Sequence, residues 1–284
     1  MICNLCPRHC GADRAAGAGF CGAPDAIVVA KAMLHFFEEP PISGKNGSGA
    51  VFFSGCNLRC VFCQNAAVSK KISGKRVSPD ELADIFYSLE EQGAHNINLV
   101  TAAPYVDGVA KALEKYRRNG TLPIVYNTSG YESVDAIKSL EGLVDVYLPD
   151  LKYLDGEAAG RYSLAPDYPR IATAAIAEMY RQQNKVVIKD GLIKRGVVIR
   201  HLVLPGLYRD SIEIVRYIAD RFPGALVSVM SQYTPEFNDG KYPELNRRIT
   251  SYEYGKVMEE VRKTKLEGYF QAVSSANPKY TPDF

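Results

Sequence analysis

Residues 55–65 read GCNLRCVFCQN, and this stretch places the thiols of Cys56, Cys60 and Cys63 close together along the chain. Thiolates are the ligands that iron–sulfur clusters need. Four irons held by only three cysteines leave one iron with an open coordination position, to which a small molecule can bind. A structural zinc site instead prefers four ligands in paired knuckles, and unpaired thiols need no fixed spacing. We therefore predict that these three cysteines bind a [4Fe-4S] cluster.

The cysteine loop, residues 55–65, directly follows an apolar run that is expected to be a strand. βα-barrel enzymes place their chemistry at the C-terminal ends of their strands. Beyond the loop, short β-branched runs alternate with amphipathic helical patterns, as in βα units around a parallel sheet. Six such units are too few for a closed eightfold barrel, so we expect an open one. The predicted strands are Ala50–Ser54, Asn96–Thr101, Pro123–Asn127, Val144–Pro149, Val197–Leu204 and Ala225–Met230.

Helical periodicity and capping residues fill the intervals between these strands. Ser78 is a predicted N-cap for a helix whose apolar face contains Leu82, Phe86 and Leu89. The glycine-rich run Gly44–Gly49 is predicted to be a loop. The stretch Asp155–Asn184 is predicted to be either an excursion over the substrate side or one long crossover. Further predicted elements are helices near Val109–Tyr116, Ile171–Gln183, Ile212–Ile218 and Tyr252–Lys265, and a terminal strand at Gly268–Val273.

The composition indicates a soluble globular protein. The chain has 284 residues, of which 46% are hydrophobic and 23% charged, enough for one large α/β domain. A net charge of +2 argues against a dedicated nucleic-acid binder. No apolar run approaches the ~18 residues of a membrane span, and the N-terminus has no secretory signal pattern. We therefore expect a cytoplasmic location, with no membrane or nucleic-acid partner.

A second cysteine set occupies the N-terminus. All seven cysteines precede residue 64, whereas disulfide frameworks spread cysteines between distant elements, so metal sites in a reducing compartment are favoured. Cys3, Cys6, Cys10 and Cys21 offer a complete tetrahedral set for Zn²⁺ or a single iron, and equally for an auxiliary [4Fe-4S] cluster. We predict two parts: a Cys-rich metal-binding segment at 1–24 and a barrel domain at 25–284.

The C-x3-C-x2-C spacing, with an aromatic residue before the third cysteine, resembles the signature of the radical S-adenosylmethionine (SAM) superfamily. The wider runs Glu38–Gly44, Gly47–Gly49 and Phe52–Gly55 are similar to the pyruvate formate-lyase activating enzyme-like branch, in a subgroup of uncharacterised iron–sulfur proteins. This resemblance implies a partial (β/α)6 barrel, with SAM held by the fourth iron. Reducing the cluster would cleave SAM and release a 5′-deoxyadenosyl radical that abstracts hydrogen from a substrate.

The same resemblance implies that strand-end residues bind SAM. Asp150 and Lys152 lie two apart and so point the same way, Asp150 toward a cation or ammonium and Lys152 toward a carboxylate; a local ion pair is the alternative. The family's Gly-Gly-Glu motif is missing, because Thr101 is followed by Ala-Ala-Pro without a carboxylate. The predicted cofactor-binding residues are Thr101, Asn127, Ser129, Asp150, Lys152 and Arg200.

Residues near the last strands carry weaker signals. His201 lies on the face of its strand opposite Arg200 and is interpreted as a packed histidine. The remaining candidates, for an adenosine or substrate wall, are Ser228, Ser231, Gln232 and Tyr233.

Three functions are compatible with these residues. The first is activation of a glycyl-radical enzyme as the protein substrate, with flavodoxin or ferredoxin as the electron donor; the short tail Ala276–Phe284 leaves room for a peptide. The second is radical SAM modification of a small molecule, a peptide or RNA. The third is a non-catalytic iron–sulfur or zinc module, which would not cleave SAM.

Overall fold

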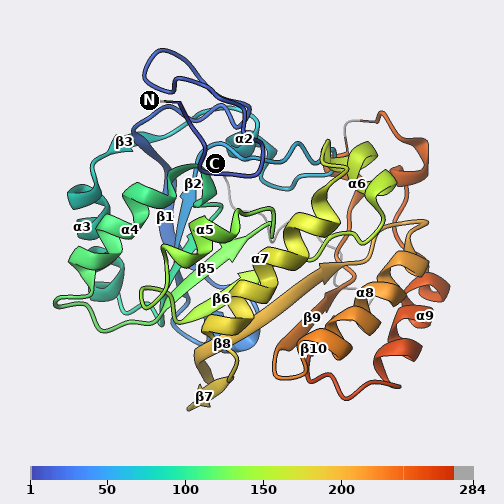
Figure 1. Cartoon of the computed structure of the whole chain (residues 1–284). Helices are drawn as coiled ribbons and strands as arrows, with labels where there is room; N and C mark the ends of the chain where they lie inside the picture. The colour runs from blue at the N-terminus through green and yellow to red at the C-terminus, as the bar shows by residue number, and fades with distance from the viewer. Residues whose placement is uncertain (1, 239, 272–284) are drawn as a thin grey trace.

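The computed structural model describes residues 2–238 and 240–271, and their strands form one sheet (Figure 1). Along the sheet the order is β10-β9-β8-β6-β5-β4-β2-β1-β3, with β7 paired to β8 as a hairpin. The strands are β1 (Ile27–His35), β2 (Ser48–Phe53), β3 (Lys75–Val77), β4 (Ile97–Val100), β5 (Ile124–Thr128), β6 (Val146–Pro149), β7 (Val187–Lys189), β8 (Leu192–Leu202), β9 (Leu226–Met230) and β10 (Gly268–Phe270).

The predicted partial barrel of parallel strands is confirmed. From β2 through β4, β5, β6, β8 and β9 to β10, every neighbouring pair is parallel. All six predicted strands are present, and the predicted terminal strand begins as β10; its last residues, 272 and 273, lie outside the described part. The carboxyl ends of these strands therefore share one edge, as a partial (β/α)6 barrel requires.

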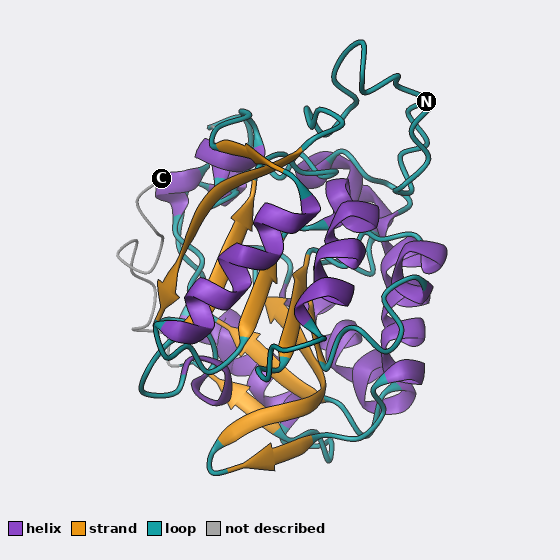
Figure 2. Cartoon of the chain, turned by 90° about the vertical axis from the view of Figure 1, so that its left-hand side faces the viewer, coloured by secondary structure: helices purple, strands orange, loops and turns teal. Residues whose placement is uncertain are grey.

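Helices pack along the outside of the sheet, α3 beside α4 at one end and α8 beside α9 at the other (Figures 1 and 2). Ser78 caps α3 with a complete capping box: Glu81 N–H donates to its hydroxyl, and the Glu81 carboxylate accepts from the Ser78 N–H. The helices are α1 (Pro40–Ser43), α2 (Ala66–Ser69), α3 (Pro79–Glu91), α4 (Val106–Tyr116), α5 (Val134–Lys138), α6 (Gly156–Ser163), α7 (Tyr168–Gln182), α8 (Tyr208–Arg221) and α9 (Ser251–Val261), with short 3-10 turns at Ala103–Tyr105, Pro235–Phe237 and Pro243–Leu245.

Two predicted helical regions differ from the structure. Helix α9 ends at Val261 rather than at Lys265, because the amides of Lys263 and Thr264 turn back three residues to the carbonyls of Glu260 and Val261. The predicted crossover 155–184 is two helices: α7 runs along the outside of the sheet, while α6 contacts the cysteine loop through the Val61 N–H, which donates to the Tyr162 carbonyl at 2.9 Å.

Strand β1 was absent from the sequence prediction. It pairs antiparallel with both β2 and β3 and so covers the edge of the parallel sheet. Its register shifts between Val29 and Lys31, and this irregularity interrupts the two-residue alternation by which strands are recognised. The predicted loop Gly44–Gly49 is wrong at its last two residues, because Ser48 and Gly49 already pair with β1 as the start of β2.

Apolar side chains fill both sides of the sheet. The larger core lies between the sheet and its helices and includes fully buried Phe86, Tyr116 and Ile176. A smaller cluster, which includes Val125 and Val198, packs on the inner face. In the described part of the chain, no helix has the length and apolar character needed to cross a membrane.

Candidate functional site

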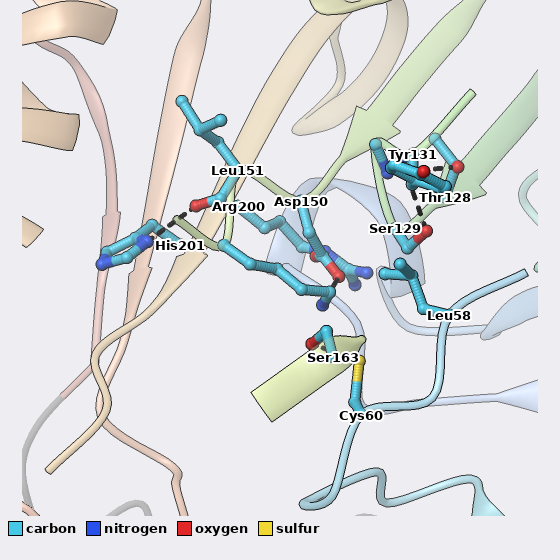
Figure 3. A network of polar contacts seen from close by, with 12 residues as sticks. Leu58, Cys60, Thr128, Ser129, Tyr131, Asp150, Leu151, Ser163, Arg200 and His201 are labelled. Atoms are coloured by element: carbon cyan, nitrogen blue, oxygen red, sulfur yellow. Dashed lines mark hydrogen bonds and ion pairs between the residues drawn. The ribbon is translucent and has the colours of Figure 1, made fainter. Parts of the chain in front are cut away.

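The carboxyl ends of the parallel strands meet the cysteine loop around a cavity of about 230 Å³. Every residue predicted to bind the cluster or SAM lines it: Thr101, Asn127, Ser129, Asp150, Lys152 and Arg200, with Cys56, Cys60 and Cys63. The chain thus brings six strand-end residues and three thiols from separate βα units to one place. Figure 3 shows Asp150 and Arg200 directed toward each other, with Cys60 beside Ser163 on the opposite side.

Each thiol of the cysteine loop has a polar neighbour. The Leu58 N–H donates to Cys56 Sγ at 3.4 Å, and the Ser163 hydroxyl of α6 donates to Cys60 Sγ at 3.1 Å. Cys63 Sγ lies 3.3 Å from the Ser69 hydroxyl at the end of α2. Such donors stabilise a thiolate, which is the form that binds iron.

Burial makes the thiols of Cys56 and Cys60 poor acids when no cation is bound beside them. It raises the pKa of Cys56 to about 12, and repulsion from Cys60 adds to the effect. The pKa of Cys60 is raised by burial as well, while the nearby Lys152 ammonium acts in the opposite direction. Metal binding at this loop must therefore release protons, and Lys152 assists that release at Cys60.

Arg200 on β8 is the centre of a buried charge network that we call the polar floor: Glu38, Asn127, Asp150, Lys152 and Arg200. Its guanidinium donates to Asp150 at 2.9 Å, to Glu38 at 3.2 Å and to the Asn127 amide oxygen at 2.7 Å. Lys152 Nζ donates to Asp150 at 2.5 Å. Asp150 and Lys152 therefore form a local ion pair and also face the cavity.

The network keeps these groups charged although they are buried. Burial opposes ionisation of Asp150, but Arg200 and Lys152 outweigh it, so the pKa of Asp150 is lowered. Burial likewise opposes the Lys152 and Arg200 charges, and the acidic neighbours, Asp150 first among them, still raise both pKa values. The cavity therefore holds both positive and negative side chains, which suits a ligand with a positive and a negative group.

Glu38 is a site residue to which the sequence assigned no role. It follows β1, lines the cavity, and accepts hydrogen bonds from the amides of Asn98 and Asn127 at 3.1 and 3.0 Å. Its carboxylate supplies negative charge in a site whose second strand ends without an acid. The available signal was a buried polar residue, Asn98, within the apolar run of β4, because such an amide needs a partner.

Thr101 and Ser129 also line the cavity. Thr101 has a φ of 63°, a left-handed conformation that is rare for a β-branched residue, and its N–H donates to the Asn127 carbonyl at 3.0 Å. The Ser129 carbonyl accepts from the Tyr168 hydroxyl at 2.8 Å, which ties this strand end to α7.

Candidates near the last strands are only partly confirmed. His201 is a packed histidine, as predicted: its ring nitrogens bond to the Leu151 carbonyl and the Ser211 hydroxyl, each at 2.8 Å. Gln232 lines the cavity. Three predicted wall residues lie in the interior instead: Ser228 is 2% exposed, Ser231 is 1% exposed, and the Tyr233 hydroxyl donates to the Leu245 carbonyl.

The N-terminal cysteine segment, described from residue 2 to 24, lies against the cysteine loop. Cys21 is buried and its carbonyl accepts from the Cys56 N–H at 3.3 Å, whereas Cys10 is exposed. Among residues 2–238 and 240–271, which contain all seven cysteines, no three cysteine, histidine or acidic side chains are gathered closely enough to hold a single metal ion. The predicted tetrahedral set is therefore not preformed.

The open parallel sheet has three cysteines after β2, and they face a charged cavity. This arrangement indicates an enzyme that binds an iron–sulfur cluster together with SAM. The sequence pattern of the radical SAM superfamily matches residues 50–218. The chain belongs to the radical SAM superfamily. An uncharacterized protein of Methanocaldococcus jannaschii, MJ0674, is 32% identical over 275 residues, which cover 93% of this chain and 75% of that protein.

Two solved structures are similar to the chain at low identity. A domain of pyruvate-formate lyase-activating enzyme from Bacteroides vulgatus has a TM-score of 0.47 and 10% identity, covering 63% of this chain and all of that domain. Methylornithine synthase has a TM-score of 0.48 and 14% identity, covering 73% of this chain and 59% of that enzyme. Neither likeness bears on the substrate.

The residues present fit the [4Fe-4S] cluster and SAM that the family implies. Three unpaired thiols with hydrogen-bond donors face the cavity, and no fourth cysteine lines it, so an iron there would keep an open position. When bound and reduced, the cluster supplies the electron that cleaves SAM. The polypeptide would hold the cluster through the three thiolates and orient a charged ligand over the polar floor.

Proposed function

We propose that this radical SAM enzyme takes a hydrogen atom from the α-carbon of a glycine in a partner protein, as glycyl-radical-enzyme activases do. One electron from flavodoxin or ferredoxin would cleave SAM to methionine and a 5′-deoxyadenosyl radical. That radical would break one C–H bond of the glycine, giving 5′-deoxyadenosine and a glycyl radical. The observation that carries the proposal is the shared cavity of the three loop thiols and the polar floor.

Within this proposal the polar floor binds the amino-acid part of SAM. Lys152 and Arg200 would face its carboxylate, and Asp150 with Glu38 its ammonium, because each pair already holds the complementary charge in the cavity. Thr101, Asn127 and Ser129 would contact the remaining polar groups. The electron donor and the intracellular location belong to the same proposal.

Two features favour a polypeptide substrate. The runs between Glu38 and Gly55 resemble the activating enzyme-like branch. Aromatic surface also lies beside the cavity: Phe37 lines it, and the adjacent Phe36 is 52% exposed. The tail Ala276–Phe284, on which the peptide argument also rested, lies outside the described residues.

The test is anaerobic reconstitution with iron and sulfide, reduction with dithionite, and chromatography of the products formed from SAM. We expect 5′-deoxyadenosine, and a glycyl-radical EPR signal once a glycyl-radical enzyme is added. 5′-Deoxyadenosine without that signal would favour a small molecule, peptide or RNA as substrate. No 5′-deoxyadenosine would favour a non-catalytic module. Lys152→Met should reduce SAM cleavage, while the matched control Lys138→Met, a lysine 56% exposed, should retain it.

A further inference from the structure

The four thiols of the N-terminal cysteine segment have no assigned role. The backbone folds back on itself between them: the Cys3 N–H donates to the Ala12 carbonyl at 2.9 Å, and the His9 N–H donates to the Cys6 carbonyl at 3.2 Å. The sulfur of Cys10 lies against Gly19, where an added Cβ would be 3.0 Å from it. Gly19 is two residues before Cys21, so the fourth cysteine follows directly on this contact.

A cation is directed at one of these sulfurs. The Arg14 guanidinium donates to Cys3 Sγ at 4.0 Å. A neutral thiol is a weak acceptor and a thiolate a strong one, so this contact suits a metal-binding thiolate better than a free thiol.

Little else folds this part of the chain. Residues 2–24 contain no helix or extended strand, and their backbone pairing is one bridge, Ile2 with Asp13, supported by the Cys3 N–H bonded to the Ala12 carbonyl at 2.9 Å. Segments with so small a core are ordinarily held by a metal or a covalent link.

The segment nevertheless makes specific contacts with the cysteine loop. Besides the bond from the Cys56 N–H to the Cys21 carbonyl, Arg59 donates to the Phe20 carbonyl, and Arg8 donates to the Asn57 carbonyl at 2.7 Å. Both guanidinium groups also contact the Phe20 ring, Arg8 at 4.1 Å and Arg59 at 5.1 Å from the ring centroid. Any change in the segment therefore reaches residues 56–59 directly.

We propose that Cys3, Cys6, Cys10 and Cys21 bind a second, thiophilic metal centre, and that this centre fixes the segment against the cysteine loop. The occupant is either one tetrahedral Zn²⁺ or iron ion or a second iron–sulfur cluster, since both need four thiolates. When the metal binds, the four sulfurs move closer together, which the turns between these cysteines allow because they belong to no helix or extended strand. The role is one of positioning, separate from SAM cleavage.

The test is metal analysis of full-length protein purified anaerobically. A Cys56→Ala/Cys60→Ala/Cys63→Ala variant removes the loop site and should retain either one zinc or iron, or about four irons with sulfide, per chain. A Cys6→Ser/Cys10→Ser variant should lose that metal and keep the loop cluster. A loop variant without bound metal, or an N-terminal variant with unchanged metal content, would overturn the proposal.

Two further measurements guard against misfolded variants. X-ray absorption of the metal retained by the loop variant should show sulfur ligands only, at about 2.3 Å for zinc; nitrogen or oxygen ligands would contradict a four-thiolate site. Removing that metal with a chelator should speed hydrogen exchange at residues 56–59, and unchanged exchange would refute the positioning role. Neither readout depends on SAM cleavage, so the proposed function stands or fails separately.

Discussion

The two cysteine regions of this protein are held in opposite ways. The cysteine loop leaves the end of β2, and its Cys60 is 9% exposed, packed under α6. The N-terminal cysteine segment has one backbone bridge and an exposed Cys10, and it is attached mainly through arginine side chains. The core packs around the first set of thiols, while in our proposal the second set is fixed by the metal that it binds.

The largest contrast should appear when one cysteine is removed from each region. Cys60→Ala should lower 5′-deoxyadenosine formation by more than about 100-fold, because losing even an outer-shell partner of a metal site costs about 10–100-fold. Cys10→Ala should lower it by no more than about 10-fold, since its effect must pass through the segment. Equal losses in both variants would show that the two regions are not independent. The measurement is product formation after anaerobic reconstitution.

Arg200→Gln tests how firmly the polar floor beside the cysteine loop is held. The variant leaves the buried Glu38 carboxylate without its cation and Asp150 with Lys152 as its remaining one. Breaking a buried pair in this way costs about 3–5 kcal/mol, which denaturant unfolding of the protein can measure. Arg209→Gln, at an exposed arginine on α8, should stay within about 0.5 kcal/mol of the unaltered protein. A small loss at Arg200 would mean that the polar floor relaxes or admits water.

Glu132 lies where the two regions meet and should give the stability a pH dependence. Its carboxyl accepts from the Thr128 hydroxyl, next to Ser133, whose hydroxyl donates to the Leu5 carbonyl of the segment. Burial raises its pKa from 4.5 to about 7.

The folded protein therefore keeps a proton that the unfolded chain releases, and this contribution to stability is complete below about pH 4.5 and lost by about pH 7. Its size is about 3 kcal/mol, from 1.36 kcal/mol for each pKa unit. Glu132→Gln should abolish that decline in unfolding free energy. Parallel stability curves for the two proteins across this range would contradict the assignment.

Arg8→Gln should have the smallest effect on the free energy of unfolding, and its effect should be confined to the N-terminal cysteine segment. It removes hydrogen bonds to the carbonyls of Asn57 and Leu164, at 2.7 and 2.5 Å. Charged hydrogen bonds contribute about 1.5–3 kcal/mol when well shielded, so a loss of about 1–2 kcal/mol is expected at this partly exposed site. Limited proteolysis within residues 1–24 should accelerate, while Arg118→Gln, at another exposed arginine, should not change it.

Sequence patterns predicted the regular part of this fold well. Helix α3 was marked by its cap at Ser78 and by apolar residues at helical spacing, and both depend only on neighbours in the chain. The strand-end positions of Asp150, Lys152 and Arg200 followed from the alternation of parallel strands. The convergence of these residues on one cavity is a consequence of the same topology.

The contacts that the sequence did not predict join distant segments. Glu38 reaches Arg200 across 162 positions of the chain, and no local pattern indicates that pairing. Ser228 and Ser231 are polar residues in and just after β9, as wall residues would be, yet both are buried and neither lines the cavity. Strand β1 was missed because its register shift between Val29 and Lys31 interrupts the alternation of buried and exposed residues.

Thr101 shows how the fold pre-arranges the cavity wall. A β-branched residue in the left-handed conformation costs about 1–3 kcal/mol, and glycine at this position would avoid most of it. The hydrogen bond from the Thr101 N–H to the Asn127 carbonyl on β5 holds this conformation. The cavity wall therefore has its shape before any ligand binds. A ligand that matches this shape is then spared the entropy of ordering it, at the expense of a less stable apoprotein.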